Sequence, residues 1–139
     1  GFIVIIQDAG DTNANDATYV AYVFAEVDGY SKIGDYYGNG NADGAFIFTG
    51  FRPAWVMIKR TDSADDWEIM DNKRSPDNGT RAYIFANTTD AETTSSSNRI
   101  DFLSNGFKAR VNASTFNTSG GRYVYLAFAD IPVKYANAR

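Results

Sequence analysis

Residues 45–60 read AFIFTGFRPAWVMIKR, and this stretch decides the fold. Its first part alternates, because Phe46 and Phe48 fall on one side of an extended chain. Its second part, AWVMI, is apolar on both sides, which is typical of a central strand covered on two faces. Between them, GFRP predicts a corner, because a proline such as Pro53 is tolerated at the start of a strand, where its missing N–H costs little. The stretch therefore predicts two strands of a packed β-protein.

The same kind of pattern continues outward from this stretch. Short β-branched and aromatic runs are separated by Gly, Asn, Asp and Ser, as in all-β sandwiches and barrels. The expected strands are 2–7, 18–26, 31–37, 45–49, 55–60, 67–71, 81–86, 99–104, 107–112 and 122–129. The polar stretch 88–98 predicts an exposed loop. We therefore expect an all-β fold, an antiparallel β-sandwich of jelly-roll or lectin-like type, with about ten short strands and little or no helix.

The composition narrows the classes of function. The chain has 139 residues, of which 44% are hydrophobic and 15% aromatic, enough for one domain with a real core. The net charge is -4 and the basic residues are scattered, so we expect no nucleic-acid partner. There is no Cys and no His, which excludes disulfides and Cys- or His-based catalysis. No stretch is long and apolar enough to predict membrane insertion.

The two ends of the chain share a pattern. Tyr19-Val20 recurs as Tyr123-Val124, and FAEV at 24–27 recurs as FADI, both 104 residues later. Gly1-Phe2 likewise recurs as GF at an offset of 105. We interpret this as a tandem array, with 1–27 the last hairpin of a preceding unit, 28–131 a complete unit and 132–139 a tail or linker. The alternative is two independent hairpins that look alike because both face a core.

The hairpin at residues 1–27 also suggests how neighbouring units assemble. We expect it to pack on the main body, and its assembly residues are predicted to be Phe2, Val4, Ile6, Tyr19 and Phe24. Exposed edge groups of such a hairpin can be covered by an adjoining unit through β-augmentation, which would join units into a stiff rod. On this hypothesis, a chain beginning at Tyr30 would unfold or aggregate.

The middle of the chain also resembles a known kind of domain. The stretches that carry the resemblance are GYSK at 29–32, GNG at 38–40, DG at 43–44, GFRPAW at 50–55, IKR at 58–60 and DFL at 101–103. They resemble an all-β domain, often duplicated, of fibre-like or tail-associated virion proteins of tailed phages, especially marine ones. The resemblance covers most of residues 19–131. It implies a virion-surface setting with a structural or adhesive role, and it transfers no catalytic residue.

One predicted hairpin holds the strongest candidate for ligand binding. The sequence DYYGNGNADG sets aromatic rings beside amide and carboxylate groups, as sugar-binding sites do. The candidate carbohydrate residues are Tyr36, Tyr37, Asn39, Asn41 and Asp43. The alternative is that one of the two tyrosines packs inward and the other covers the sheet edge.

Catalysis and metal binding have weaker support. The acidic residues Asp62, Asp65, Asp66, Glu68 and Asp71 are interpreted as a solvated loop and the wet face of a strand, so we expect no enzyme activity. The segments 11–16 and 39–44 echo the start of a calcium loop, but neither has the bidentate Glu that completes one. We therefore expect no cofactor and no metal site, with calcium as the alternative.

These observations favour a non-enzymatic structural or adhesive module of an extracellular fibre, on the surface of a virion. The expected partners are neighbouring copies or tandem units and, in addition, glycans of the host surface. Two alternatives stay open. One is a lectin-like domain for host glycans, and the other is a subunit of a non-viral surface filament that assembles by strand donation.

Overall fold

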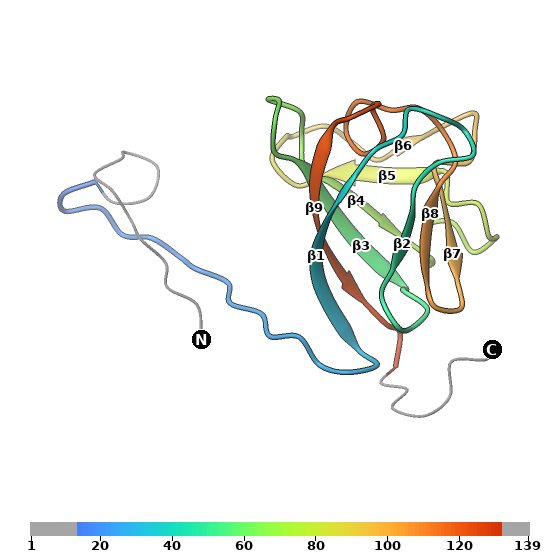
Figure 1. Ribbon diagram of the computed structural model, residues 1–139. Helices are drawn as coiled ribbons and strands as arrows, with labels where there is room; N and C mark the ends of the chain where they lie inside the picture. Colours follow the sequence, from blue (N-terminus) through green and yellow to red (C-terminus); the bar gives the residue numbers. More distant parts are fainter. Residues whose placement is uncertain (1–13, 132–139) are drawn as a thin grey trace.

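The computed structural model of the protein describes residues 14–131, and every regular element in that range is a β-strand (Figure 1). The strands are β1 (Ser31–Tyr37), β2 (Phe46–Phe48), β3 (Trp55–Arg60), β4 (Glu68–Asp71), β5 (Ala82–Phe85), β6 (Thr93–Thr94), β7 (Ile100–Leu103), β8 (Gly106–Ala109) and β9 (Arg122–Phe128). They form a six-stranded sheet in the order β1-β9-β3-β4-β5-β6 and a three-stranded sheet in the order β2-β8-β7. All strand pairs are antiparallel. The prediction of an all-β sandwich is confirmed.

The core lies between the two sheets. β3 contributes Val56 and Ile58, which are fully buried, and β9 contributes Tyr123. From the small sheet, Phe107 meets the ring of Tyr125 edge to face at 5.4 Å between centroids. The predicted central position of the AWVMI strand is confirmed, since β3 pairs with β9 on one side and with β4 on the other.

The outer face of the large sheet also carries apolar side chains, which explains why AWVMI is apolar on both sides. Met57 lies in register with Leu126 of β9 and with Ile69 of β4. The row continues through Ile33 on β1 and Ile84 on β5. Of these five residues Ile33 is exposed and the others are partly exposed. The side chains of β3 therefore have apolar neighbours on both faces, in the core through Val56 and Ile58 and on the outer face through Met57.

The expected strands correspond well to the observed ones after residue 30. The ranges 31–37 and 55–60 match β1 and β3, and the other strands agree to within a few residues. The stretch predicted as a loop at 88–98 contains the short strand β6, because Thr93 and Thr94 pair with β5. The expected strand 2–7, with three of the predicted assembly residues, and the tail 132–139 lie outside the described residues.

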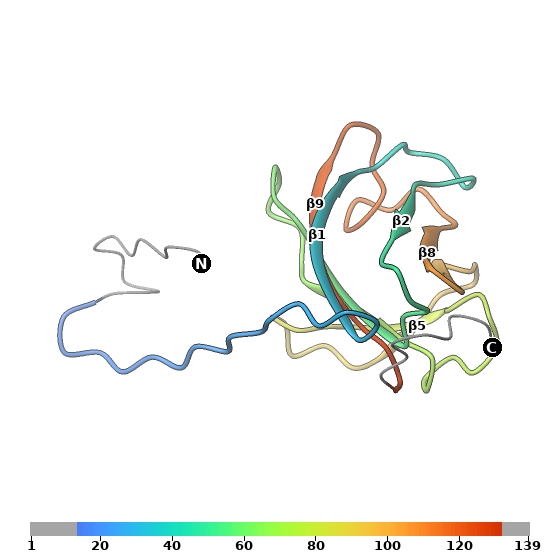
Figure 2. The same ribbon diagram turned by 60° about the horizontal axis from the view of Figure 1, so that its bottom comes forward.

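The predicted strand at 18–26 is wrong. These residues form no strand, and in Figures 1 and 2 the segment runs away from the sandwich instead of lying on a sheet. A strand needs a hydrogen-bonded neighbour, and none of the described strands pairs with this segment. The described part of the predicted hairpin is therefore not packed along the main body.

Candidate functional site: the arm, its joint and the base groove

Residues 18–24, which we call the arm, have the side chains of a buried strand but lie in solvent. Val20, Tyr22 and Val23 are 78%, 83% and 76% exposed. Tyr19 and Phe24, two of the predicted assembly residues, are less exposed at 42% and 47%. Because apolar residues occupy both alternating sides of the segment, covering it would require contacts on two faces.

A hydrogen-bonded joint, residues 25–33, fixes the arm to the sandwich. The Ser31 hydroxyl donates to the carbonyl of Ala25 at 2.8 Å and accepts from the N–H of Val27 at 2.9 Å. The N–H of Ser31 donates to the carbonyl of Val27 at 2.9 Å, which closes a tight turn. Gly29 occupies this turn with φ of 71°, a conformation that glycine adopts at little cost.

Two side-chain contacts strengthen the joint. Glu26 accepts hydrogen bonds from Lys32 at 3.1 Å and from the backbone N–H of Ile33 at 3.1 Å. These hydrogen bonds lower the pKa of the Glu26 carboxyl, with that from Lys32 the larger cause. At the end of the arm, the ring of Phe24 meets the ring of Phe128 edge to face, with 5.6 Å between centroids. The direction in which the chain enters the sandwich is thus held by several independent contacts.

The chain enters and leaves the sandwich at the same end, which we call the base. Ser31, the first residue of β1, lies in register with Phe128, the last residue of β9. Figure 1 shows the arm and the end of β9 leaving from this side of the molecule. β3 begins at the base as well, because Trp55 also lies in register with Phe128.

An open groove of about 580 Å³ lies at the base beside the joint. Its lining residues are Ala54, Trp55, Asp71, Asn72, Lys73, Arg74, Ala129 and Asp130. Asp71 pairs with Arg74 at 2.7 Å, and Lys73 reaches Asp130 at 3.3 Å. The side-chain oxygen of Asn72 is buried and accepts no hydrogen bond from any residue of the range 14–131. The groove therefore presents the indole of Trp55 and the half-exposed carboxylate of Asp130 to a polar ligand.

The predicted carbohydrate group is only partly at the surface. Tyr37 is 62% exposed. Tyr36 points into the core instead, where its ring stacks on Tyr123 at 5.2 Å and its hydroxyl donates to the carbonyl of Phe116 at 2.7 Å. Burial raises the pKa of Tyr36 well above its ordinary value, with smaller contributions from Tyr123 and Glu68. Tyr36 is thus not part of an exposed aromatic face. Side chains of a strand point alternately to its two faces, and in β1 this alternation directs Tyr36 into the core and Tyr37 to the solvent.

The remaining members of that group hold their own loop together. The Asn39 side chain donates to the carbonyl of Asp43 at 2.9 Å and accepts from the N–H of Asn41 at 3.0 Å. The side-chain oxygen of Asn41 accepts from the N–H of Asp43 at 3.0 Å. Asp43 pairs with Lys108 at 2.5 Å, and this hydrogen bond lowers the pKa of the Asp43 carboxyl. These polar groups act first as turn formers, although they stay solvent-exposed.

The sequence analysis missed a buried ion pair. Glu68, interpreted as solvated, is fully buried, and Asp71 is 8% exposed, so both assignments to a wet surface are wrong. Arg99 binds Glu68 with two hydrogen bonds of 2.6 and 2.7 Å, and its guanidinium lies over the ring of Tyr83 at 4.1 Å. The hydroxyl of Thr115 donates to the same carboxylate. The signal available in the sequence was parity, since Glu68 shares its side of β4 with the buried Met70.

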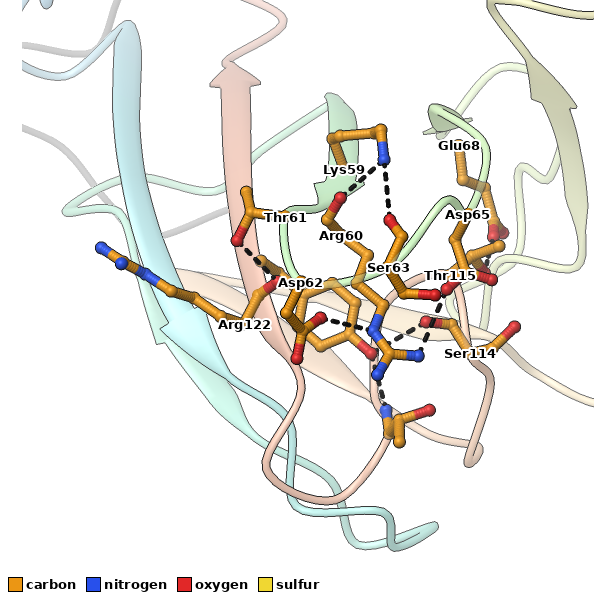
Figure 3. A network of polar contacts seen from close by, with 12 residues as sticks. Lys59, Arg60, Thr61, Asp62, Ser63, Asp65, Glu68, Ser114, Thr115 and Arg122 are labelled. Carbon is orange, nitrogen blue, oxygen red and sulfur yellow. Dashed lines mark hydrogen bonds and ion pairs between the residues drawn. The ribbon is translucent and has the colours of Figure 1, made fainter.

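Beside Glu68, a second polar cluster closes the loop between β3 and β4. Arg60 binds Asp62 at 2.6 Å and Asp65 at 3.2 Å, and Lys59 donates to the carbonyl of Ser63 at 3.4 Å. Figure 3 shows this cluster next to the contact between Thr115 and Glu68. The arginine of each cluster is paired with a carboxylate, which is an arrangement that stabilises loops and sheet contacts.

The described residues give no sign of a metal centre or a membrane helix. None of their His, Cys, Asp and Glu side chains gather in a group of three or more that could hold a metal ion, the 39–44 segment included. Within residues 14–131, no helix has the length and apolar character needed to cross a bilayer.

Fold and site together define a β-sandwich module with an exposed strand-like arm at its base. A family model described as a domain of unknown function, DUF7483, matches residues 2–132, and the chain belongs to that family. No curated protein and no solved structure matches the chain significantly.

Proposed function

We propose that the chain is a non-enzymatic structural and adhesive module of an extracellular fibre, carried on a virion appendage. The observation that supports this proposal is the arm. It presents apolar side chains on both faces, and the joint holds it in a fixed relation to the sandwich. A segment of this kind is built to be covered by a neighbouring unit, as strands are in assemblies that associate through β-structure. The resemblance to duplicated phage virion domains supports the setting.

Immunogold electron microscopy tests the setting directly. Antibodies raised against the purified chain are applied to intact particles of the phage that encodes the chain and to the cells that this phage infects. Antibody preabsorbed on the purified chain is the control. Label at the appendages of the particles is the expected result. Label confined to cells without particles would overturn the proposal.

The base groove favours a second candidate function, binding of a host glycan. Sugars bind where an aromatic ring lies beside amide and carboxylate groups, and the lining of the groove combines Trp55 with Asn72 and the half-exposed Asp130. On this proposal the ligand site moves from the predicted loop to the base.

A glycan array with two matched variants tests this candidate. We expect a saccharide that binds the wild type to be lost with Trp55→Ala and kept with Tyr37→Ala, both variants being first shown to unfold cooperatively. Loss with Tyr37→Ala alone would return the site to the loop around residues 37–43, and the absence of any saccharide signal would refute glycan binding. Electron microscopy of the same purified wild type separates out the non-viral filament, which would self-assemble.

A further inference from the structure

Residues 14–27 repeat the local geometry of the segment that closes the sandwich. Asp16 has a positive φ of 59°, and Gly120, 104 residues later, has a φ of 73°. The N–H of Ala17 donates to the carbonyl of Ala14 at 3.3 Å, as the N–H of Gly121 does to Thr118 at 3.0 Å.

The tyrosine that follows each turn repeats a third feature. The hydroxyl of Tyr19 accepts from the N–H of Ala14 at 2.7 Å, and the hydroxyl of Tyr123 accepts from the N–H of Thr118 at 2.8 Å. The three features share the offset of 104 at which the sequences match. A positive φ at a residue with a side chain, such as Asp16, is uncommon, so its agreement with Gly120 is informative.

The same offset places the arm on β9, the strand between β1 and β3. Tyr19 and Val23 correspond to Tyr123 and Ala127, which point inward and are completely buried. Val20 and Tyr22 correspond to Val124 and Leu126, which point outward and carry part of the outer apolar face. A strand in the position of β9 buries its inward side chains and partly shields its outward ones between β1 and β3. This position would therefore cover much of the apolar surface that the arm exposes.

We propose that residues 14–27 are the closing turn and last strand of a second sandwich of the same fold, inserted between the equivalents of β1 and β3 in that unit. This inference rests on the proposed function in one respect, because it assumes that the module functions beside a second unit of the same kind. The partner is therefore a unit of this same family, and the contact is a central strand rather than an added edge strand.

The joint then fixes how the two units meet. The last strand of the second unit ends at its base, and within a few residues the chain starts β1 at the base of this one. Phe24 corresponds to Phe128, and these equivalent rings touch each other. Contact between equivalent residues is the mark of an approximate two-fold relation. The units thus pair base to base in this proposal, because each unit takes in and releases the chain at one end. This arrangement differs from the stiff rod that the sequence suggested.

A fusion that supplies the missing part of the second unit tests the proposal. A copy of residues 28–105 is joined to the N-terminus of the full chain, so that 1–27 stand where 106–131 would follow. The control fusion carries residues 106–131 in place of 1–27 at the same junction. Hydrogen exchange of the backbone amides of residues 18–26 is the readout, because it reports burial of the arm itself.

We expect these amides to exchange rapidly in the single chain and at least about 100-fold more slowly in the fusion. Val23→Asp should restore rapid exchange of residues 18–26 in the fusion. In the single chain it should leave the amide exchange rates of residues 28–131 unchanged. Rapid exchange in the fusion beside slow exchange in the control would overturn the proposal, as would a control that fails to form two units. Slow exchange in the single chain, accompanied by dimers or filaments, would place the arm on another copy's edge and overturn it too. None of these outcomes alters the immunogold result, so the two proposals fail independently.

Discussion

At the scale of single residues, the buried pair of Glu68 and Arg99 connects the two sheets. Glu68 is on β4, and Arg99 stands immediately before β7. We expect Glu68→Ala to lower the free energy of unfolding by about 3–5 kcal/mol, because the guanidinium would stay buried without its carboxylate. Denaturant unfolding measures the loss. Glu92→Ala is the matched control, since its 3.6 Å contact with Arg74 is half exposed and should contribute less than about 1 kcal/mol. Equal losses for both variants would contradict the assignment.

Tyr36 gives the protein a predictable response to alkali. Its pKa lies well above the ordinary value of 10.0 in the folded state, mainly because burial disfavours the phenolate. The stability that the neutral hydroxyl contributes is therefore complete below pH 10.0 and is lost as the pH rises from there through the folded-state pKa. Urea unfolding between about pH 8 and pH 12 should show this decline.

Tyr36→Phe separates this effect from the other tyrosines. The variant should lose about 0.5–1.5 kcal/mol at neutral pH, because the carbonyl of Phe116 loses its donor, and should decline less steeply in alkali. Tyr37→Phe, at an exposed position of the same strand, should follow the wild type throughout. A Tyr36→Phe profile parallel to the wild type would show that another group causes the decline.

At the scale of elements, the loop after β1 is held by the turn before β9. Gly38 donates to the carbonyl of Gly121 at 2.9 Å and accepts from the N–H of Gly120 at 3.0 Å. A Cβ on Gly38 would lie 2.4 Å from the backbone oxygen of Thr118, so one of the two elements would have to shift. We expect Gly38→Ala to cost about 1–3 kcal/mol in a thermal or denaturant melt. Ala42→Ser, exposed in the same loop, should stay within about 0.5 kcal/mol, and a similar loss for both would refute this role of Gly38.

Strands were predictable from the sequence where β-branched and aromatic runs end at turn-forming residues. β1 and β3 are examples, because Gly29 and Gly38 flank the first run and Pro53 and Asp62 flank the second. The sequence does not decide which of Tyr36 and Tyr37 points inward, since either ring suits a sheet. Glu68 was misassigned because its partner Arg99 is distant in sequence and belongs to the other side of the sandwich. β6 was missed because its two threonines are strand residues only through their pairing with β5.

At the scale of the whole molecule, the sandwich is complete without the arm. Within residues 14–131, every strand of both sheets lies at or after Ser31, and the first buried residue of the apolar core is Ile47. The contacts described between the arm and the body include the joint and the edge-to-face pair of Phe24 with Phe128. The sequence of the arm is that of a β-strand, but strand formation needs a partner. This is why a pattern that predicts a strand at 18–26 produced an exposed segment.

A chain that begins at Asp28 tests this separation between arm and body. We expect it to unfold cooperatively with the slope against denaturant of a folded sandwich. It should lose about 2–4 kcal/mol, because it loses the pair of Phe24 with Phe128 and the hydrogen bonds that Ala25, Glu26 and Val27 make in the joint. A matched pair of charge substitutions in the full chain gives the control. Tyr22→Asp, 83% exposed, should leave the midpoint unchanged, whereas Leu126→Asp, at the equivalent position on β9, should cost several kcal/mol. Unfolding or aggregation of the shortened chain, together with a large loss in Tyr22→Asp, would mean that the first 27 residues belong to the same cooperative unit as the body, as the sequence alone suggested.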